Sequence, residues 1–398
     1  MPAPVLPEVI LKQGKERKVR NFHPWLYKDE IASLSRAAER MPPPGGIVAL
    51  KDAGGAFVAK AWFSPKARLA VRVLTRDERE DIDRGFFVRR FTLAKALRER
   101  TLPGVEAFRA VHAEADDLPG ILVDSYAGHL VLQLRYAGSD TWRTTIADAL
   151  EEVFKPRGIW ERSDMEGRKE EGLPPVSGAV RGTVPAEVPF VEGGARFRAL
   201  VHTGHKTGFY LDQRENRDLI ARRVKPGWKV LDAFASTGAF SVRAALSGAD
   251  VTSVEKDPAA AKAIEAHAAD NGVAERVTVR NADAFDDLAK LPEGTFDLAI
   301  IDPPAIAKKK EEQGTARWGF VTLSKLALGR LKPGGLLFVS SCAYHLSPTL
   351  LEETVRIAGG ETGKRLRVVT ETFQPPDHPW ILQIPETLYL KSLLVEVA

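Results

Sequence analysis

The fold of this chain is decided by the stretch Lys229-Val230-Leu231-Asp232-Ala233-Phe234-Ala235-Ser236-Thr237-Gly238-Ala239-Phe240. A short apolar run ends at an acidic residue, and a turn that contains a glycine then leads into an apolar, helix-like segment. Similar runs recur with helical patterning between them, and we expect strands at Lys229–Asp232, Val251–Glu255, Val277–Arg280, Leu298–Asp302 and Leu336–Ser340. This alternation predicts an α/β domain with a doubly wound, mostly parallel sheet over residues 186–398.

One of the intervening helices is marked at both ends. Asp257 is a suitable N-cap, Pro258 suits the first helical position, and Asn271-Gly272 follows an Ala-rich segment as a stop signal. These signals predict a helix over Pro258–Asp270.

The length and composition are those of a globular chain with several domains. Its 398 residues are 44% hydrophobic and 28% charged, and they are too many for one compact core. No apolar run is long enough to cross a bilayer, and no export signal is recognised at the N-terminus. The single cysteine, Cys342, excludes an internal disulfide framework and favours a cytoplasmic location. His202 and His205 lack neighbouring ligands, so no metal site is predicted.

Two segments precede the α/β domain. Residues 1–75 are patterned as short strands joined by tight turns, including a hairpin at Gly54-Gly55, and they predict a small β-rich domain. Residues 76–185 begin with a helical pattern at Phe86–Arg100 and continue with strand patterns and a second helix, which predicts an α+β domain. The stretch from Met165 to Gly182 is rich in charge, Gly and Pro and predicts a linker.

Positive charge is concentrated in the first segment. Residues 1–75 hold 13 Lys and Arg against 6 Asp and Glu, a net charge of +7, whereas the whole chain carries +4. A basic module on a near-neutral body favours a polyanionic partner such as a nucleic acid, and a solvated basic surface is the alternative.

Three acidic residues and a glycine lie near the predicted carboxyl ends of the first three strands. Ligands of doubly wound sheets bind outside these ends, and Asp232, Phe234 and Gly238 lie at the first crossover. Glu255 is placed to accept from the hydroxyls of a ribose, and Asp283 from an adenine amino group. The turn is not G-x-G-x-x-G, which disfavours a dinucleotide. Together these residues resemble the motifs of class I methyltransferases, which bind S-adenosylmethionine.

The ends of the fourth and fifth strands carry the candidate catalytic residues. Asp302-Pro303-Pro304 ends the fourth strand, and the turn Lys332-Pro333-Gly334-Gly335 precedes the fifth, which delivers Cys342 to the same edge. A cysteine thiolate that adds to carbon 6 of a pyrimidine activates carbon 5 for methylation, and Asp302 is placed to act as the acid. The alternative role of Cys342 is that of a small buried side chain.

Longer motifs occur along nearly the whole chain. They are Lys12-x-Gly14-x-Glu16-Arg17, His23-Pro24-Trp25, Glu114-Ala115-Asp116-Asp117-Leu118-Pro119-Gly120 and Lys206-Thr207-Gly208-Phe209-Tyr210-Leu211-Asp212-Gln213-Arg214. Together with Cys342 they resemble the PUA-domain-containing 23S rRNA 5-methylcytosine methyltransferases of bacteria. The resemblance implies a PUA-like RNA-binding domain over 1–75, a central α+β domain over 76–185 and a Rossmann-like S-adenosylmethionine-dependent methyltransferase domain over 186–398.

The resemblance also implies roles for individual residues. Asp302 and Cys342 would act on a cytosine of 23S rRNA that has left its stack. The cofactor S-adenosylmethionine would be held by Tyr210, Gln213, Asp232, Phe234, Gly238, Glu255, Asp283 and Asp302. A lysine commonly follows the family's Asp-Pro-Pro, whereas Ala305 stands here. Lys308–Lys310 follow shortly afterwards, and we expect them to contact phosphate.

Two other functions fit the same sequence. An rRNA guanine N-methyltransferase on this scaffold would need no cysteine. A non-catalytic RNA-binding or ribosome-assembly factor would need no cofactor, and the intact acidic residues at the strand ends argue against a vestigial pocket.

Overall fold

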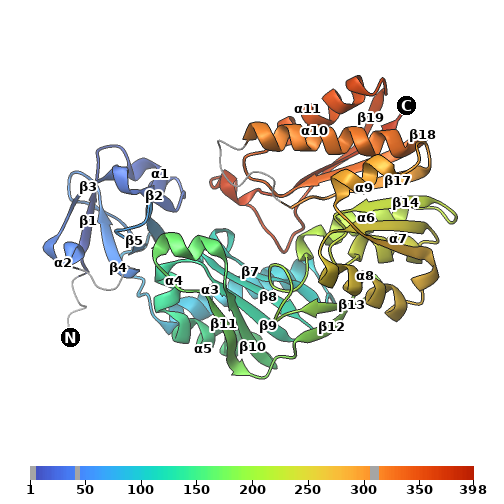
Figure 1. Cartoon of the computed structure of the whole chain (residues 1–398). Helices are drawn as coiled ribbons and strands as arrows, with labels where there is room; N and C mark the ends of the chain where they lie inside the picture. Colours follow the sequence, from blue (N-terminus) through green and yellow to red (C-terminus); the bar gives the residue numbers. More distant parts are fainter. Residues whose placement is uncertain (1–5, 41–44, 305–312) are drawn as a thin grey trace. The chain divides into compact units, whose positions relative to one another are not determined.

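The computed structural model describes residues 6–40, 45–304 and 313–398, and the chain divides into two compact units (Figure 1). The first unit comprises Met1–Val188, Ala199–Phe209 and Pro376–Thr387, and the second comprises Pro189–Arg198, Tyr210–Pro375 and Leu388–Ala398. The chain therefore returns twice to the first unit after leaving it.

The N-terminal part of the first unit is a six-stranded sheet of order β2-β6-β5-β4-β1-β3. Its strands are β1 (Glu8–Leu11), β2 (Trp25–Tyr27), β3 (Ile31–Leu34), β4 (Gly46–Lys51), β5 (Phe57–Phe63) and β6 (Leu69–Thr75), with the short helices α1 (Glu16–Arg20) and α2 (Arg36–Glu39). Asp52 closes the β4–β5 turn by accepting from the backbone N–H groups of Gly54 (3.0 Å) and Ala56 (2.9 Å). The β-rich fold of this segment is as predicted.

A second sheet, of order β11-β10-β9-β8-β7, follows in the same unit. Its strands are β7 (Ala107–His112), β8 (Ile121–Tyr126), β9 (His129–Leu134), β10 (Gly158–Ser163) and β11 (Val176–Gly182), and its helices are α3 (Arg84–Thr101), α4 (Ala137–Thr141) and α5 (Arg143–Phe154). The stretch predicted as a linker contains β11, which pairs antiparallel with β10. This edge strand was missed because Gly178 and Gly182 interrupt its apolar pattern.

The second unit is built on a seven-stranded sheet of order β16-β15-β14-β17-β18-β20-β19. Its strands are β14 (Lys229–Ala233), β15 (Asp250–Glu255), β16 (Val277–Asn281), β17 (Phe296–Ile301), β18 (Leu331–Ser341), β19 (Leu366–Phe373) and β20 (Lys391–Val397). The first five strands of this order are parallel, as predicted, and the last two pair antiparallel. The sheet is therefore mostly parallel.

Helices cover both faces of this sheet. On one side lie α6 (Arg214–Arg223), α7 (Ala239–Leu246) and α8 (Pro258–Asp270), and on the other α9 (Ala284–Lys290), α10 (Gln313–Arg330) and α11 (Pro348–Glu361) (Figure 1). Alternate strand residues such as Leu231 and Ala233 are buried against α9–α11. The α8 helix has the predicted bounds, and the Asp257 side chain caps it by accepting from the N–H of Ala259 (3.0 Å).

Strand β18 begins earlier than predicted. It starts at Leu331, which pairs with Phe296, and the next partners are Leu336 and Leu298. The turn Lys332-Pro333-Gly334-Gly335 is therefore an irregularity inside the strand, with Gly334 at a φ of +74°, and does not precede it.

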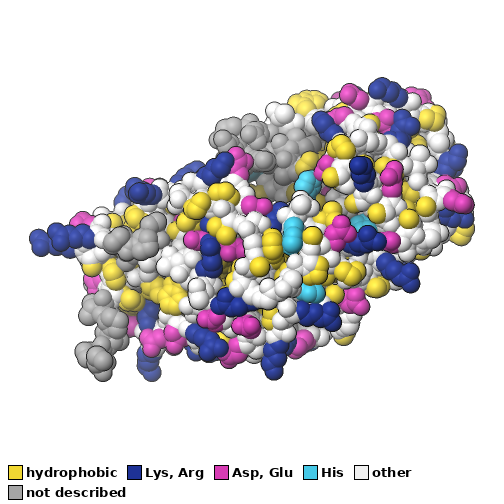
Figure 2. All heavy atoms as spheres, turned by 60° about the horizontal axis from the view of Figure 1, so that its bottom comes forward, with side chains coloured by type: hydrophobic (Ala, Val, Ile, Leu, Met, Phe, Trp, Pro, Cys, Tyr) yellow, Lys and Arg dark blue, Asp and Glu magenta, His cyan; other side chains and the backbone are white. Residues whose placement is uncertain are grey.

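Basic side chains are partly neutralised by local acidic partners. In the N-terminal part of the first unit, Arg20 of α1 pairs with Asp52 (2.7 Å) and Lys51 pairs with Glu8 (2.6 Å). On the face shown in Figure 2, Lys and Arg side chains lie scattered among Asp and Glu. Across the described ranges, no helix has both the length and the apolarity needed to span a membrane.

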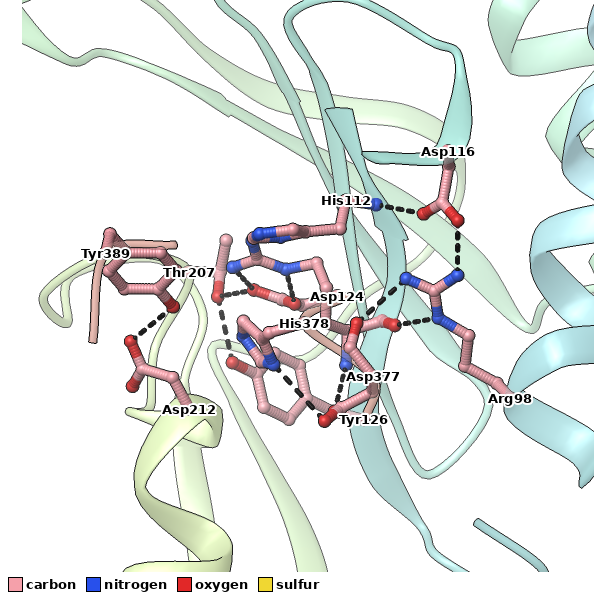
Figure 3. Close-up of polar contacts among 11 residues, drawn as sticks. Arg98, His112, Asp116, Asp124, Tyr126, Thr207, Asp212, Asp377, His378 and Tyr389 are labelled. Carbon is pink, nitrogen blue, oxygen red and sulfur yellow. Dashed lines mark hydrogen bonds and ion pairs between the residues drawn. The ribbon is translucent and has the colours of Figure 1, made fainter. Parts of the chain in front are cut away.

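A buried polar network holds the returning segments in the first unit (Figure 3). Asp124, 1% exposed, accepts from Arg109 (3.1 Å to Nη2) and from the hydroxyl of Thr207, which also lies 2.9 Å from the Tyr126 hydroxyl. Asp377 accepts from the backbone N–H of Arg109 (2.9 Å). Because these charges are buried, each depends on its partners, and Ala199–Phe209 and Pro376–Thr387 are held in place.

His112 is a buried member of this network. Its Nδ1 lies 3.0 Å from Arg109 Nη1, and its ring meets His378 edge to face. Burial, followed by the charge of Arg109, lowers the pKa of His112 well below 6.5. The folded protein therefore contains a neutral histidine whose Nδ1 accepts a hydrogen bond.

This shift predicts a pH-dependent stability. Below pH 6.5 the unfolded chain binds a proton at His112 that the folded protein does not, so the free energy of unfolding decreases as the pH falls. The urea concentration at the midpoint of unfolding should fall more steeply between pH 7.5 and pH 5 for the wild type than for His112→Gln. The exposed His205→Gln variant should follow the wild type. Parallel curves for the wild type and His112→Gln would contradict this prediction.

Candidate active site

The crossover after β14 is a tight loop. Phe234, Ser236 and Gly238 all have left-handed backbone angles, with φ of +62°, +51° and +79°. A Cβ atom at Gly238 would lie 2.7 Å from the Cγ2 atom of Ile264 on α8. Gly238 therefore allows both the turn and the close approach of α8.

Glu255, the last residue of β15, braces this loop. Its Oε2 accepts from the N–H of Ser236 (2.7 Å), and its Oε1 accepts from the N–H of Asp257 (2.9 Å). The carboxylate is thus fixed at the carboxyl end of the sheet, next to the crossover. Each oxygen retains a lone pair for a hydroxyl donor.

Asp283 follows β16 and caps α9. Its Oδ1 accepts from the N–H of Phe285 (3.0 Å), and its Oδ2 accepts from Lys256 Nζ (3.1 Å). The hydrogen bond from Lys256 is the main cause that lowers the pKa of Asp283. The rings of Phe234 and Phe285 meet edge to face with centroids 6.3 Å apart. This end of the site therefore combines an ionised carboxylate with aromatic surface.

Asp232 is placed differently from the other acidic residues. It is 1% exposed, and its Oδ2 accepts from the hydroxyl of Ser241 (2.6 Å), which contacts Ser253. Burial raises the pKa of Asp232 to about 7, and the nearby charges of Asp302 and Glu255 add to the rise. Its carboxyl group is therefore turned toward α7 and lies beneath the site.

Gln213 connects the ends of β17 and β18. Its Nε2 donates to Asp302 Oδ2 (3.0 Å) and to Ser340 Oγ (2.8 Å), and its Oε1 accepts from Asn216 (2.6 Å). The strand register pairs Ile301 with Val339, so the next residues, Asp302 and Ser340, lie side by side on the adjacent strands. Gln213 is buried, and these three hydrogen bonds of its amide group hold neighbouring side chains.

Cys342 follows directly on β18 and is half-buried. Tyr210 lies at the start of the short helix Leu211–Gln213, where its carbonyl accepts from Arg217 (2.9 Å). The structure thus brings the predicted residues of β14, β15, β16, β17 and β18 to one edge of one sheet. Two features of the sequence analysis lie outside the described residues. They are Ala305, which departs from the family's lysine, and Lys308–Lys310, which were expected to contact phosphate.

Lys391 is a residue of this edge that the sequence analysis missed. It is the first residue of β20, it is 2% exposed, and it pairs in register with Ser341. Burial lowers its pKa to about 8, and Cys342 is the group that opposes this change. A lysine within the mostly apolar run from Leu388 to Val395 was a signal that could have identified it.

The fold and the residues at this edge define a Rossmann-like S-adenosylmethionine-dependent methyltransferase. Residues 179–395 match the family model described as S-adenosylmethionine-dependent methyltransferase, and residues 9–76 match a PUA-like domain. The chain is 38% identical over 397 residues to a protein from Shewanella amazonensis named Ribosomal RNA large subunit methyltransferase I, covering 98% of this chain and 99% of that one. A protein of the same name from Alteromonas mediterranea is 35% identical over 396 residues, covering 98% of each chain. The chain belongs to the family of these proteins.

Solved structures share the fold. A candidate S-adenosylmethionine-dependent methyltransferase from Streptococcus mutans superposes with a TM-score of 0.81 at 21% identity, covering 98% of this chain and 100% of its own. A second structure, described as a methyltransferase complexed with SAH, gives a TM-score of 0.83 at the same identity and coverage. At this identity the likeness concerns the fold alone.

The crossover loop gives a prediction for the cofactor. Gly238→Ala should weaken S-adenosylmethionine binding about tenfold or more, because left-handed strain and the contact with Ile264 shift the loop. Isothermal titration calorimetry measures the affinity. The control is Gly272→Ala, where φ is +67° but nothing lies within 4 Å of the added Cβ. If both variants bind the cofactor like the wild type, the loop has no part in binding.

Proposed function

We propose that this protein methylates carbon 5 of a cytosine in 23S rRNA through a covalent adduct with Cys342. The observation that carries the proposal is the position of Cys342. It follows β18 at the carboxyl edge of the sheet, and the neighbouring strand β17 ends at Asp302, which Gln213 fixes. The names of the relatives support the large-subunit rRNA as substrate, and the PUA-like match supports RNA binding.

The reaction needs a nucleophile and an acid on one side of the base. The Cys342 thiolate forms a bond to carbon 6 while Asp302 gives a proton to the ring nitrogen N3, and carbon 5 becomes nucleophilic. S-Adenosylmethionine supplies the methyl group when bound. A base then removes the proton from carbon 5, the bond to Cys342 breaks, and the proton on N3 returns to Asp302. The ring is left with one methyl group in place of one hydrogen.

The cofactor-binding residues are proposed on the same basis. Glu255 and Asp283 offer fixed carboxylates for ribose and adenine donors, and Phe234 offers ring surface beside Asp283. Gly238 shapes the crossover. Gln213 and Asp232 support the site by holding neighbouring side chains, since both are buried and bonded to protein groups. Tyr210 and Asp302 complete the set.

The RNA partner and the cellular location are also parts of the proposal. The PUA-like domain and its excess of basic residues would bind RNA with a strength that falls as salt rises. The domain limits 1–75, 76–185 and 186–398 remain predictions. An rRNA substrate would place the protein in the cytoplasm with the ribosome.

Nucleoside mapping of 23S rRNA tests the reaction. In cells lacking this gene, one 5-methylcytosine should be absent, and the wild type should restore it. Cys342→Ala should not restore it, although the purified variant should bind S-adenosylmethionine like the wild type, because only the nucleophile is removed.

The alternatives give different outcomes in the same experiment. A missing methylguanine with an unchanged cytosine map, restored by Cys342→Ala, would favour the guanine N-methyltransferase. No change in any nucleoside, together with no cofactor binding, would favour the non-catalytic factor.

Asp302 gives a second prediction. Asp302→Asn should lower the single-turnover rate of methylation by about 10²–10⁴-fold, because the amide cannot protonate the ring nitrogen. Asp297→Asn is a matched control near the other end of β17, where the carboxylate pairs with Lys332 (2.8 Å). A rate for Asp302→Asn within a few-fold of the control would remove Asp302 from the role of acid.

A further inference from the structure

Lys391 places a buried ammonium group on the strand next to Cys342. β20 pairs antiparallel with β18, and the register sets Lys391 opposite Ser341, the residue before Cys342. Its Nζ donates to the carbonyl of Ala343, the residue after Cys342, and to the carbonyl of Tyr389 (2.9 Å). The ammonium group is thus held against the carbonyl that follows Cys342, while the backbone of Lys391 pairs with the residue that precedes it.

Among the described residues, no carboxylate partners the charge of this ammonium group. Within residues 6–40, 45–304 and 313–398, no Asp or Glu forms an ion pair with Lys391, although its side chain is 2% exposed. An isolated buried ammonium is costly, and two carbonyl oxygens compensate for only part of the lost hydration. The charged group that favours the ammonium form of Lys391 is Cys342. This interaction is mutual, so the ammonium favours the thiolate to the same extent.

Other titratable groups lie near this edge. Asp302 follows the adjacent strand β17. Its ionised form opposes a thiolate, whereas its protonated form, which the proposed reaction requires, does not. Tyr344 and His345 follow Cys342 in the chain. Tyr389 precedes Lys391, and its hydroxyl donates to Asp212 (2.8 Å), as Figure 3 shows. Lys391 is the group of this set that is buried and mostly protonated at pH 7, because its pKa of about 8 lies above that pH.

We propose that Lys391 is a positioning residue that stabilises the Cys342 thiolate and orients the backbone that carries it. A catalytic role for the interaction between Lys391 and Cys342 rests on the proposed function. The interaction between the two groups does not depend on that function. A lysine that only ties together the ends of β18 and β20 would hold the same two carbonyls and leave the ionisation of Cys342 unchanged. The pH dependence of the thiol therefore separates the two roles.

The experiment uses the fact that Cys342 is the single cysteine of the chain. The rate of alkylation of the full-length protein by iodoacetamide, followed by intact mass from pH 5.5 to 10, reports this thiol alone. The wild-type midpoint should lie at least about one pH unit below the value of about 8.5 for a free cysteine. In Lys391→Met the midpoint should rise by about one unit or more, and Lys391→Arg should stay near the wild type.

Lys332→Met is the matched control, because Lys332 lies near the opposite end of β18 and pairs with Asp297. It should leave the midpoint unchanged. A Lys391→Met midpoint equal to that of the wild type would overturn the proposal. If Lys391→Met does not fold, a wild-type midpoint at or above about 8.5 would overturn it without any variant.

The two proposals fail in different ways. If Cys342→Ala still forms 5-methylcytosine while the alkylation midpoints shift as expected, the nucleophile assignment fails and the ion pair stands. If Cys342→Ala is inactive and the midpoints do not move, the ion pair fails and the assignment stands.

Discussion

The candidate active site depends on the hydrogen bonds that Gln213 makes across the ends of two parallel strands. Parallel strands present their carboxyl ends at one edge, but this alone does not fix the side chains that follow. The amide of Gln213 donates to both Asp302 and Ser340, and its oxygen is in turn held by Asn216. Because Gln213 is buried, these bonds are not weakened by competition with water. Asp302 and Ser340, which lies two residues before Cys342, therefore occupy fixed places relative to each other.

Much of the fold could be predicted because its signals are local. The strand and helix periods of the α/β domain gave its parallel core, and the Asp257-Pro258 start gave the bounds of α8. The acidic residues at the strand ends could be found because topology brings such ends together. Strands with weak sequence patterns could not be predicted. Glycines interrupt the apolar pattern of β11. The sequences of the antiparallel strands β19 and β20 do not indicate their positions in the sheet.

The environment of each site residue could not be predicted in the same way. The sequence places Asp232 with the cofactor, but the burial that raises its pKa to about 7 comes from α7 and β15 packing around it. Lys391 is 49 residues from Cys342 in the chain, and only the β18–β20 register, which pairs Lys391 with Ser341, brings the two near each other. Such pairings depend on strand order, which local patterns do not contain.

Because the chain passes several times between the two units, it cannot be cut once into two fragments that each contain one whole unit. The segments Ala199–Phe209 and Pro376–Thr387 belong to the first unit, although each is flanked on both sides by chain of the second. Thr207 and Asp377 are bonded to Asp124 and Arg109 in its interior. A fragment cut near residue 186 would carry these segments away from their partners and expose buried charge in both pieces. The two units are thus interlaced along the sequence, and neither corresponds to a single excisable stretch of the gene.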